Sequence, residues 1–181
     1  MTTEDFKENI LPLNRKLLGF ANRFMKDLDD AKDIVQEIYI KLWNMRQDLD
    51  QYHSVEALAM RMTRNLCLDK IKLNKTVPLN GFRKENIEDK HHVYEKKEEL
   101  ELAVKRVKDI IDHLEEPQKT IILLRDIEGY DNQEIAQILN MNVNTIRVNL
   151  SRTRKKIRDI LLKKYYQHEP GKNKSSIREI L

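Results

Sequence analysis

The segment 131–156 places the strongest constraint on the fold, because it carries signals for two helices joined by a very short turn. Asp131 stands three residues before Glu134, which is the spacing of a capping box and predicts that a helix begins at the next residue. Asn140 can adopt the left-handed conformation that ends a helix, and Asn142 can cap the following helix through its side-chain oxygen. The sequence therefore predicts a helix-turn-helix.

The second helix of this motif combines an apolar side with a strongly basic side. Between Asn142 and Tyr165 there are eight Lys or Arg residues and a single acid, Asp159, although the whole chain has a net charge of only +4. A basic helix after a tight turn suits phosphate contact, and shorter side chains near its N-terminus suit base edges in a major groove. We therefore predict that this helix binds DNA. The alternative is a solvated basic helix on an unrelated bundle.

Composition favours an all-α protein. Of 181 residues, 35% are charged and 6% aromatic, with 4 Gly and 4 Pro, which is typical of helix-rich chains with few tight turns. The single Cys67 lies in an apolar helical pattern and is expected to pack rather than react.

Features of enzymes, metal sites and membrane proteins are missing from the sequence. The four glycines are scattered, so no phosphate-binding loop is expected, and the adjacent His91 and His92 would point in different directions on a helix. The N-terminus is polar and the longest apolar run has four residues. We expect a cytoplasmic protein that is not an enzyme, with no cofactor, no metal site, no small-molecule substrate and no membrane insertion.

The chain divides into two helical domains. Residues 84–101 contain seven acids and four lysines with few apolar side chains, as expected of a linker. The predicted organisation is a first domain over 1–75, an acidic linker over 76–100, a second domain over 101–166 and a tail over 167–181.

The first domain contains an acidic helix followed by a basic one. In the segment DAKDIVQEIYIKLW (30–43), six residues form a core stripe, which leaves acids on the other faces: Ala31, Ile34, Val35, Ile38, Leu42 and Trp43. The segment ALAMRMTRNLCLDKIKLNK (57–75) then carries five Lys or Arg residues against Asp69 alone. An acidic helix face by itself usually means only solvation.

Taken together, these motifs resemble those of the bacterial extracytoplasmic-function (ECF) sigma factors. The resemblance rests on D-A-x-D-I-V-Q-E and R-N-x-x-x-D upstream, and on R-D-I-E-G-Y-x-x-x-E-I-A and T-I-R-x-x-L-x-R-x-R-K-K-I downstream, in that order. It covers about residues 11–75 and 104–162. It implies that the first domain is sigma region two, the second is region four, and the chain directs promoter-specific initiation by RNA polymerase.

The resemblance also implies partners and contact residues. Core RNA polymerase would bind through its β′ clamp helices and its β flap, promoter DNA would be read at two elements, and an anti-sigma factor would regulate the chain. The residues implied for the clamp are Asp33, Gln36, Glu37 and Ile40. Those implied for the −10 element are Tyr52, His53, Ser54, Arg61, Arg64, Asn65, Lys70 and Lys72. Those implied for the −35 element are Asn144, Thr145, Arg147, Val148, Ser151 and Arg152, with Lys155 and Lys156 on phosphates.

One departure from the family pattern concerns the −10 element. Many relatives have an aromatic residue where this chain has Leu58, so the shape of the base pocket and the promoter sequence stay open. Two other functions also stay open. An autonomous helix-turn-helix regulator would bind an operator as a dimer, and a helical adaptor or anti-sigma-like protein would use the acidic surfaces alone. Stable binding to core polymerase without promoter DNA would distinguish the sigma factor from both.

Overall fold

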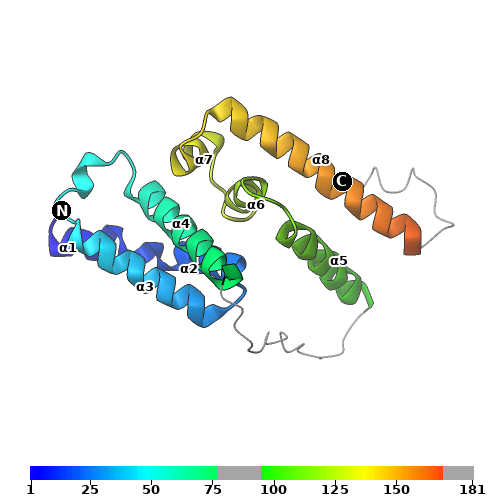
Figure 1. Cartoon of the computed structure of the whole chain (residues 1–181), viewed down its shortest axis with the longest axis horizontal. Helices are drawn as coiled ribbons and strands as arrows, with labels where there is room; N and C mark the ends of the chain where they lie inside the picture. Colours follow the sequence, from blue (N-terminus) through cyan, green and yellow to red (C-terminus); the bar gives the residue numbers. More distant parts are fainter. Residues whose placement is uncertain (77–94, 169–181) are drawn as a thin grey trace. The chain divides into compact units, whose positions relative to one another are not determined.

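The computed structural model describes residues 1–76 and 95–168, and within these ranges every regular element is helical. The all-α prediction is confirmed (Figure 1). The predicted linker from 77 to 94, with His91 and His92, and the tail from 169 lie outside the described residues. No described helix has the length and apolar character needed to cross a bilayer.

The described residues form two compact units. Residues 1–76 belong to the first unit together with 123–146, and residues 95–122 belong to the second together with 147–168. The helix-turn-helix therefore begins in the first unit, and its second helix continues in the other one. The domain limits expected from the sequence remain a prediction.

In the first unit, α2 (Asn14–Met25), α3 (Leu28–Asn44) and α4 (Val55–Thr76) pack against one another (Figure 1). They follow α1 (Thr3–Asn9) and the short helix η1 (Leu11–Leu13). Their shared core contains large side chains that are less than 2% exposed and whose burial is the main favourable term in folding: Ile10, Leu17, Phe20, Ile38, Leu42, Leu49 and Met60. Cys67 is also fully buried, which confirms its expected packing role.

Trp43 was predicted to lie in this core, and that prediction is wrong. Trp43 is 37% exposed. The ring lies at the edge of the bundle, where it meets the ring of Phe6 edge-on at 5.1 Å between centroids and lies 4.5 Å from the guanidinium carbon of Arg46. An amphipathic ring can cover the margin of a core in this way without entering it.

The helix-turn-helix has the local structure expected from its capping residues. The side chain of Asp131 accepts hydrogen bonds from the backbone N–H groups of Gln133 and Glu134, at 2.7 and 2.8 Å, and so begins α7 (Asn132–Leu139). Glu134 accepts the N–H of Asp131 in return at 2.6 Å, which completes the capping box. Asn140 is left-handed, with a φ of 51°.

The second helix of the motif, α8 (Val143–His168), begins with the predicted cap. The side-chain oxygen of Asn142 accepts the N–H of Asn144 at 2.8 Å. The segment before the motif is irregular, because a short α6 (Gln118–Ile122) continues into a wide π-helical turn, η3 (Leu123–Ile127). In the second unit, the first six residues of α5 (Glu95–Asp112) belong to the end of the segment expected to be the linker, 76–100.

Candidate nucleic-acid interface

The face of α3 predicted to bind polymerase is exposed. Asp33, Gln36, Glu37 and Ile40 all point away from the core, and Ile40 is 61% exposed. The Asp27 side chain accepts the N–H groups of Asp29 and Asp30 and fixes the start of the helix. The face thus presents one large apolar side chain among acids, although Glu37 already forms an ion pair with Lys41 at 2.6 Å.

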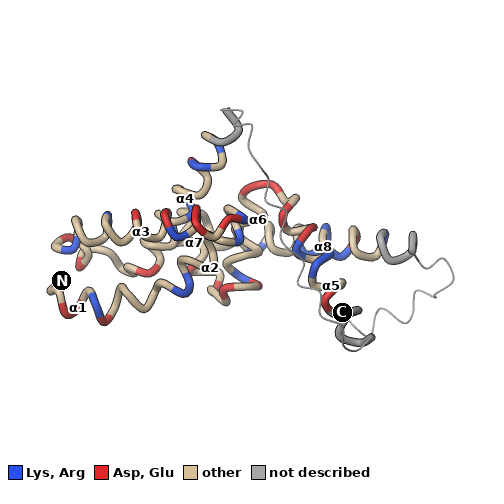
Figure 2. The backbone as a smooth tube through the Cα atoms, turned by 90° about the horizontal axis from the view of Figure 1, so that it is seen from below, with Lys and Arg blue, Asp and Glu red and all other residues tan. Residues whose placement is uncertain are grey.

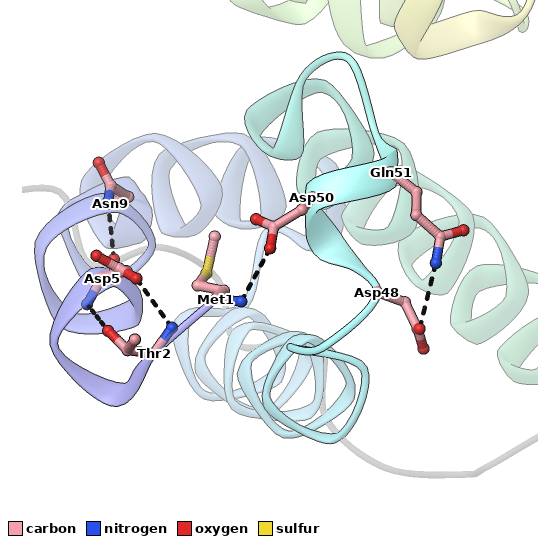
Figure 3. A network of polar contacts seen from close by, with 7 residues as sticks. All are labelled: Met1, Thr2, Asp5, Asn9, Asp48, Asp50 and Gln51. Atoms are coloured by element: carbon pink, nitrogen blue, oxygen red, sulfur yellow. Dashed lines mark hydrogen bonds and ion pairs between the residues drawn. The ribbon is translucent and has the colours of Figure 1, made fainter.

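The loop that leads into α4 is held at several points before it reaches the residues predicted to meet a base. It contains the short helix η2 (Leu49–Gln51), whose Leu49 is fully buried. Figure 3 shows the neighbouring contacts: the N-terminal amine of Met1 pairs with Asp50 at 3.0 Å, and the Gln51 amide donates to Asp48 at 3.3 Å. In the same view Thr2 and Asp5 form the capping box of α1. Leu49 and Asp50 therefore hold the loop to the rest of the unit, and the bond from Gln51 to Asp48 closes it internally.

The three loop residues implied for the −10 element differ in whether their side chains are exposed or already form a hydrogen bond within the protein. Tyr52 is 41% exposed and His53 is exposed. The Ser54 hydroxyl, however, accepts the N–H of Ala57 at 3.1 Å and so caps the first turn of α4. Ser54 consequently has a structural task that the sequence analysis did not assign.

Along α4 the residues predicted to bind DNA are only partly available. Asn65 and Lys72 are exposed, whereas Arg61, Arg64 and Lys70 are half-buried. The Lys70 ammonium lies 2.7 Å from the carboxylate of Asp30 on α3, so its charge is partly compensated. A phosphate would compete with Asp30 for this ammonium.

All eight residues predicted to face DNA on α8 are exposed: Asn144, Thr145, Arg147, Val148, Ser151, Arg152, Lys155 and Lys156. Figure 2 shows the Lys and Arg residues that follow one another along this helix. The opposite side is apolar, with Ile146 and Leu150 buried. Sequence reasoning missed Thr153, which is 1% exposed and whose hydroxyl lacks a hydrogen-bond partner among the described residues.

Comparison with known proteins finds a family match for each half of the chain. Residues 11–76 match the Sigma-70 region 2 profile, and residues 105–157 match Sigma-70, region 4. These two matches contain the acidic face of α3, the basic segment of α4 and the basic face of α8. The chain belongs to the ECF sigma factors. Its function is therefore that of a sigma factor, which directs RNA polymerase to promoters.

The matches to individual relatives have low sequence identity but cover most of this chain. The sigma factor is 28% identical over 160 residues to RNA polymerase sigma-H factor of Pseudomonas aeruginosa, covering 82% of this chain and 81% of that protein. It is 22% identical to ECF RNA polymerase sigma factor SigG of Mycobacterium tuberculosis, of which it spans 48%. The fold is similar to that of the sigma factor RpoE from Bartonella quintana, solved with the anti-sigma factor NepR, at a TM-score of 0.67 and 23% identity, covering 88% and 98% of the two chains.

A further group of polar residues was not singled out from the sequence. It joins α2 and the start of α4 to the turn before α7. Tyr130 is 5% exposed; burial, and then its hydrogen bond to Glu56, raise the pKa of its hydroxyl. Burial acts to raise the pKa of Glu56 as well, but hydrogen bonds from Lys16 and Tyr130 outweigh it and lower that pKa. A Tyr next to Glu-Gly was visible in the sequence, but nothing local indicated its partners.

Proposed function

We propose that this sigma factor binds core RNA polymerase through the exposed face of α3 and reads a promoter at two places. The loop before α4 and the basic segment of α4 from Arg61 to Lys72 would contact the −10 element, and the N-terminal turns of α8 would enter the major groove of the −35 element. The proposal rests on one observation. A single chain carries an acidic face on α3 with an exposed apolar residue at its centre, and separate basic faces on α4 and α8, and all three lie inside the matched regions.

The three surfaces suit different tasks. Ile40, exposed among acids on α3, offers an apolar contact with a charged rim, and rim charges set the orientation and the association rate of a complex. On α8, side chains near the N-terminus are short or carry a fork-shaped guanidinium, which suits base edges, whereas the lysines further along suit phosphates.

We infer two further properties of the protein. The RpoE structure contains the anti-sigma factor NepR, and a second sigma factor of similar fold, CnrH, was solved with the cytosolic domain of CnrY. These complexes support an anti-sigma factor as a partner of this chain too. Because a sigma factor acts on chromosomal promoters together with core polymerase, we also infer that the protein acts in the cytoplasm.

The test is transcription in a purified system. Core polymerase with the protein should initiate at a small set of promoters, and core polymerase should retain the protein in a pull-down without DNA. The free protein should bind the same promoters weakly. Tight and specific promoter binding by the free protein at physiological salt, without retention by core polymerase, would instead favour an autonomous helix-turn-helix regulator.

A further inference from the structure

Lys70 lies apart from the exposed face of α4 that carries other residues predicted to bind DNA. Asn65 and Lys72 are exposed, and residues seven positions apart share one face of a helix. Lys70 instead follows Thr63 and Cys67 at steps of four and three residues, and both of these are fully buried. Lys70 therefore starts from the packed side of α4, and its long stem carries the ammonium out toward solvent.

The ammonium of Lys70 meets a carboxylate where it emerges. Its Nζ lies 2.7 Å from Oδ1 of Asp30, in the first turn of α3, and the two side chains are 32% and 33% exposed. The pair of Lys72 with Asp69 is looser, at 3.9 Å on one helix, with side chains 76% and 65% exposed. Because solvent weakens the attraction between charges, Asp30 holds Lys70 more firmly than Asp69 holds Lys72.

The carboxylate of Asp30 has a fixed place on the protein. The Asp27 side chain accepts the backbone N–H groups of Asp29 and Asp30 at 2.9 and 3.0 Å, which holds the first turn of α3. The Asp30 side chain is short, whereas Lys70 has a flexible four-carbon stem. Any rearrangement that frees the ammonium therefore moves Lys70 rather than Asp30.

A phosphate that approaches Lys70 meets this carboxylate first. It must either displace Asp30 from the ammonium or bind beside it, where the two anions repel each other. An unpaired lysine on duplex DNA releases counterions and contributes about 0.9 to the slope of log K against log salt. A lysine that a carboxylate already neutralises releases fewer, so both the affinity and the slope are reduced.

We propose that Asp30 is a positioning residue of −10 binding, which acts through Lys70 and limits the strength of the phosphate contact that this lysine makes. The proposal deepens the proposed function and rests on it, because it takes α4 to bind the −10 element. A weakened contact suits an initiation factor, since polymerase has to leave the promoter after transcription begins.

The experiment measures the affinity of the holoenzyme for promoter DNA. The full-length protein is assembled with core polymerase, and binding to a promoter found in the transcription test is followed by fluorescence anisotropy at several salt concentrations. Three variants are compared with wild type: Asp30→Asn, which keeps the size of the side chain and removes its charge, Lys70→Ala, and the double variant D30N/K70A.

Asp30→Asn should raise the affinity about tenfold, the change expected when one charge-assisted hydrogen bond no longer has to be given up. The slope of log K against log salt should become steeper by about 0.7 to 0.9, depending on whether the strand is single or paired. In the Lys70→Ala background the same substitution should change neither quantity, because no ammonium is left to release. A purely structural role of Asp30 predicts no gain that depends on Lys70.

The matched control is Asp29→Asn, one residue away. It removes an equal charge from a carboxylate that is 87% exposed and pairs with Lys32 on its own helix at 3.0 Å. This substitution frees no cation on α4, so the affinity and its salt slope should stay as in wild type.

The results divide cleanly between the two proposals. A gain in D30N that disappears in D30N/K70A supports the role of Asp30, and the comparison of backgrounds removes any effect of the substitution on stability or on polymerase binding. No gain, an equal change in both backgrounds, or an equal gain from Asp29→Asn would overturn it. A wild-type chain that gives core polymerase no promoter affinity would refute the proposed function itself.

Discussion

Positions along α8 allow base reading and phosphate binding to be separated by mutation. Arg147 is the fifth residue of the helix, and Lys155 follows eight residues later. At about 1.5 Å per residue the two are about 12 Å apart along the axis, which is about the width of the major groove. When Arg147 reaches a base edge, Lys155 and Lys156 consequently lie at the groove margin, beside the sugar-phosphate backbone.

The two sets of side chains should produce different losses. Arg147→Ala should cost about 1–3 kcal/mol, or about 5- to 150-fold in affinity, and should relax the preference at one or two base pairs of the −35 element. Changing Lys155 and Lys156 together to Ala should weaken every upstream sequence alike. Because each phosphate contact contributes about 0.9 to the slope of log K against log salt, the slope should fall by about two units.

The assay is a selection from randomised upstream elements, carried out with core polymerase at two salt concentrations. Lys108→Ala provides the control, since Lys108 is an exposed cation on α5 with no proposed DNA contact. If Arg147→Ala keeps the wild-type consensus and the double lysine variant alters it, α8 docks in the groove in a different register from the one proposed here.

Three further predictions concern the other elements. Reversing the charges of Asp33 and Glu37 should slow assembly with core polymerase and leave binding of the free protein to a −35 duplex unchanged; equal assembly would mean that these acids are merely solvated. Asp131→Ala removes the acceptor of two backbone N–H groups and should lower the free energy of unfolding by about 1 kcal/mol in urea titrations, whereas Asp131→Asn should not, and equal losses would contradict the capping argument. Leu49→Ala, at a fully buried position, should lower the free energy of unfolding by about 2–5 kcal/mol. In promoter selections it should relax the sequence preference at the −10 element more than at the −35 element. Equal relaxation at both elements would mean that other contacts hold the loop.

The sequence predicted what depends on near neighbours and missed what depends on distant ones. The caps at Asp131, Asn140 and Asn142 involve residues two to four positions apart, so their geometry could be inferred directly. Lys70 was counted as a free DNA-binding cation, but its partner Asp30 lies 40 positions away on another helix. Tyr130 and Glu56 are 74 positions apart. Such pairs arise only when helices pack, and the binding roles of the exposed residues remain predictions for the same reason.

The turn of the helix-turn-helix has a consequence for how promoter preference can change. The side chains that define it, those of Asp131, Glu134 and Asn142, bond to backbone groups within the motif itself, and Asn140 supplies the left-handed residue without a glycine. The side chains at the exposed positions of α8 take no part in these bonds. Promoter preference can therefore change by substitutions on the exposed surface of α8, while the capping bonds that orient the helix stay intact. Duplicated copies of such a gene could then acquire separate sets of promoters without first losing stability.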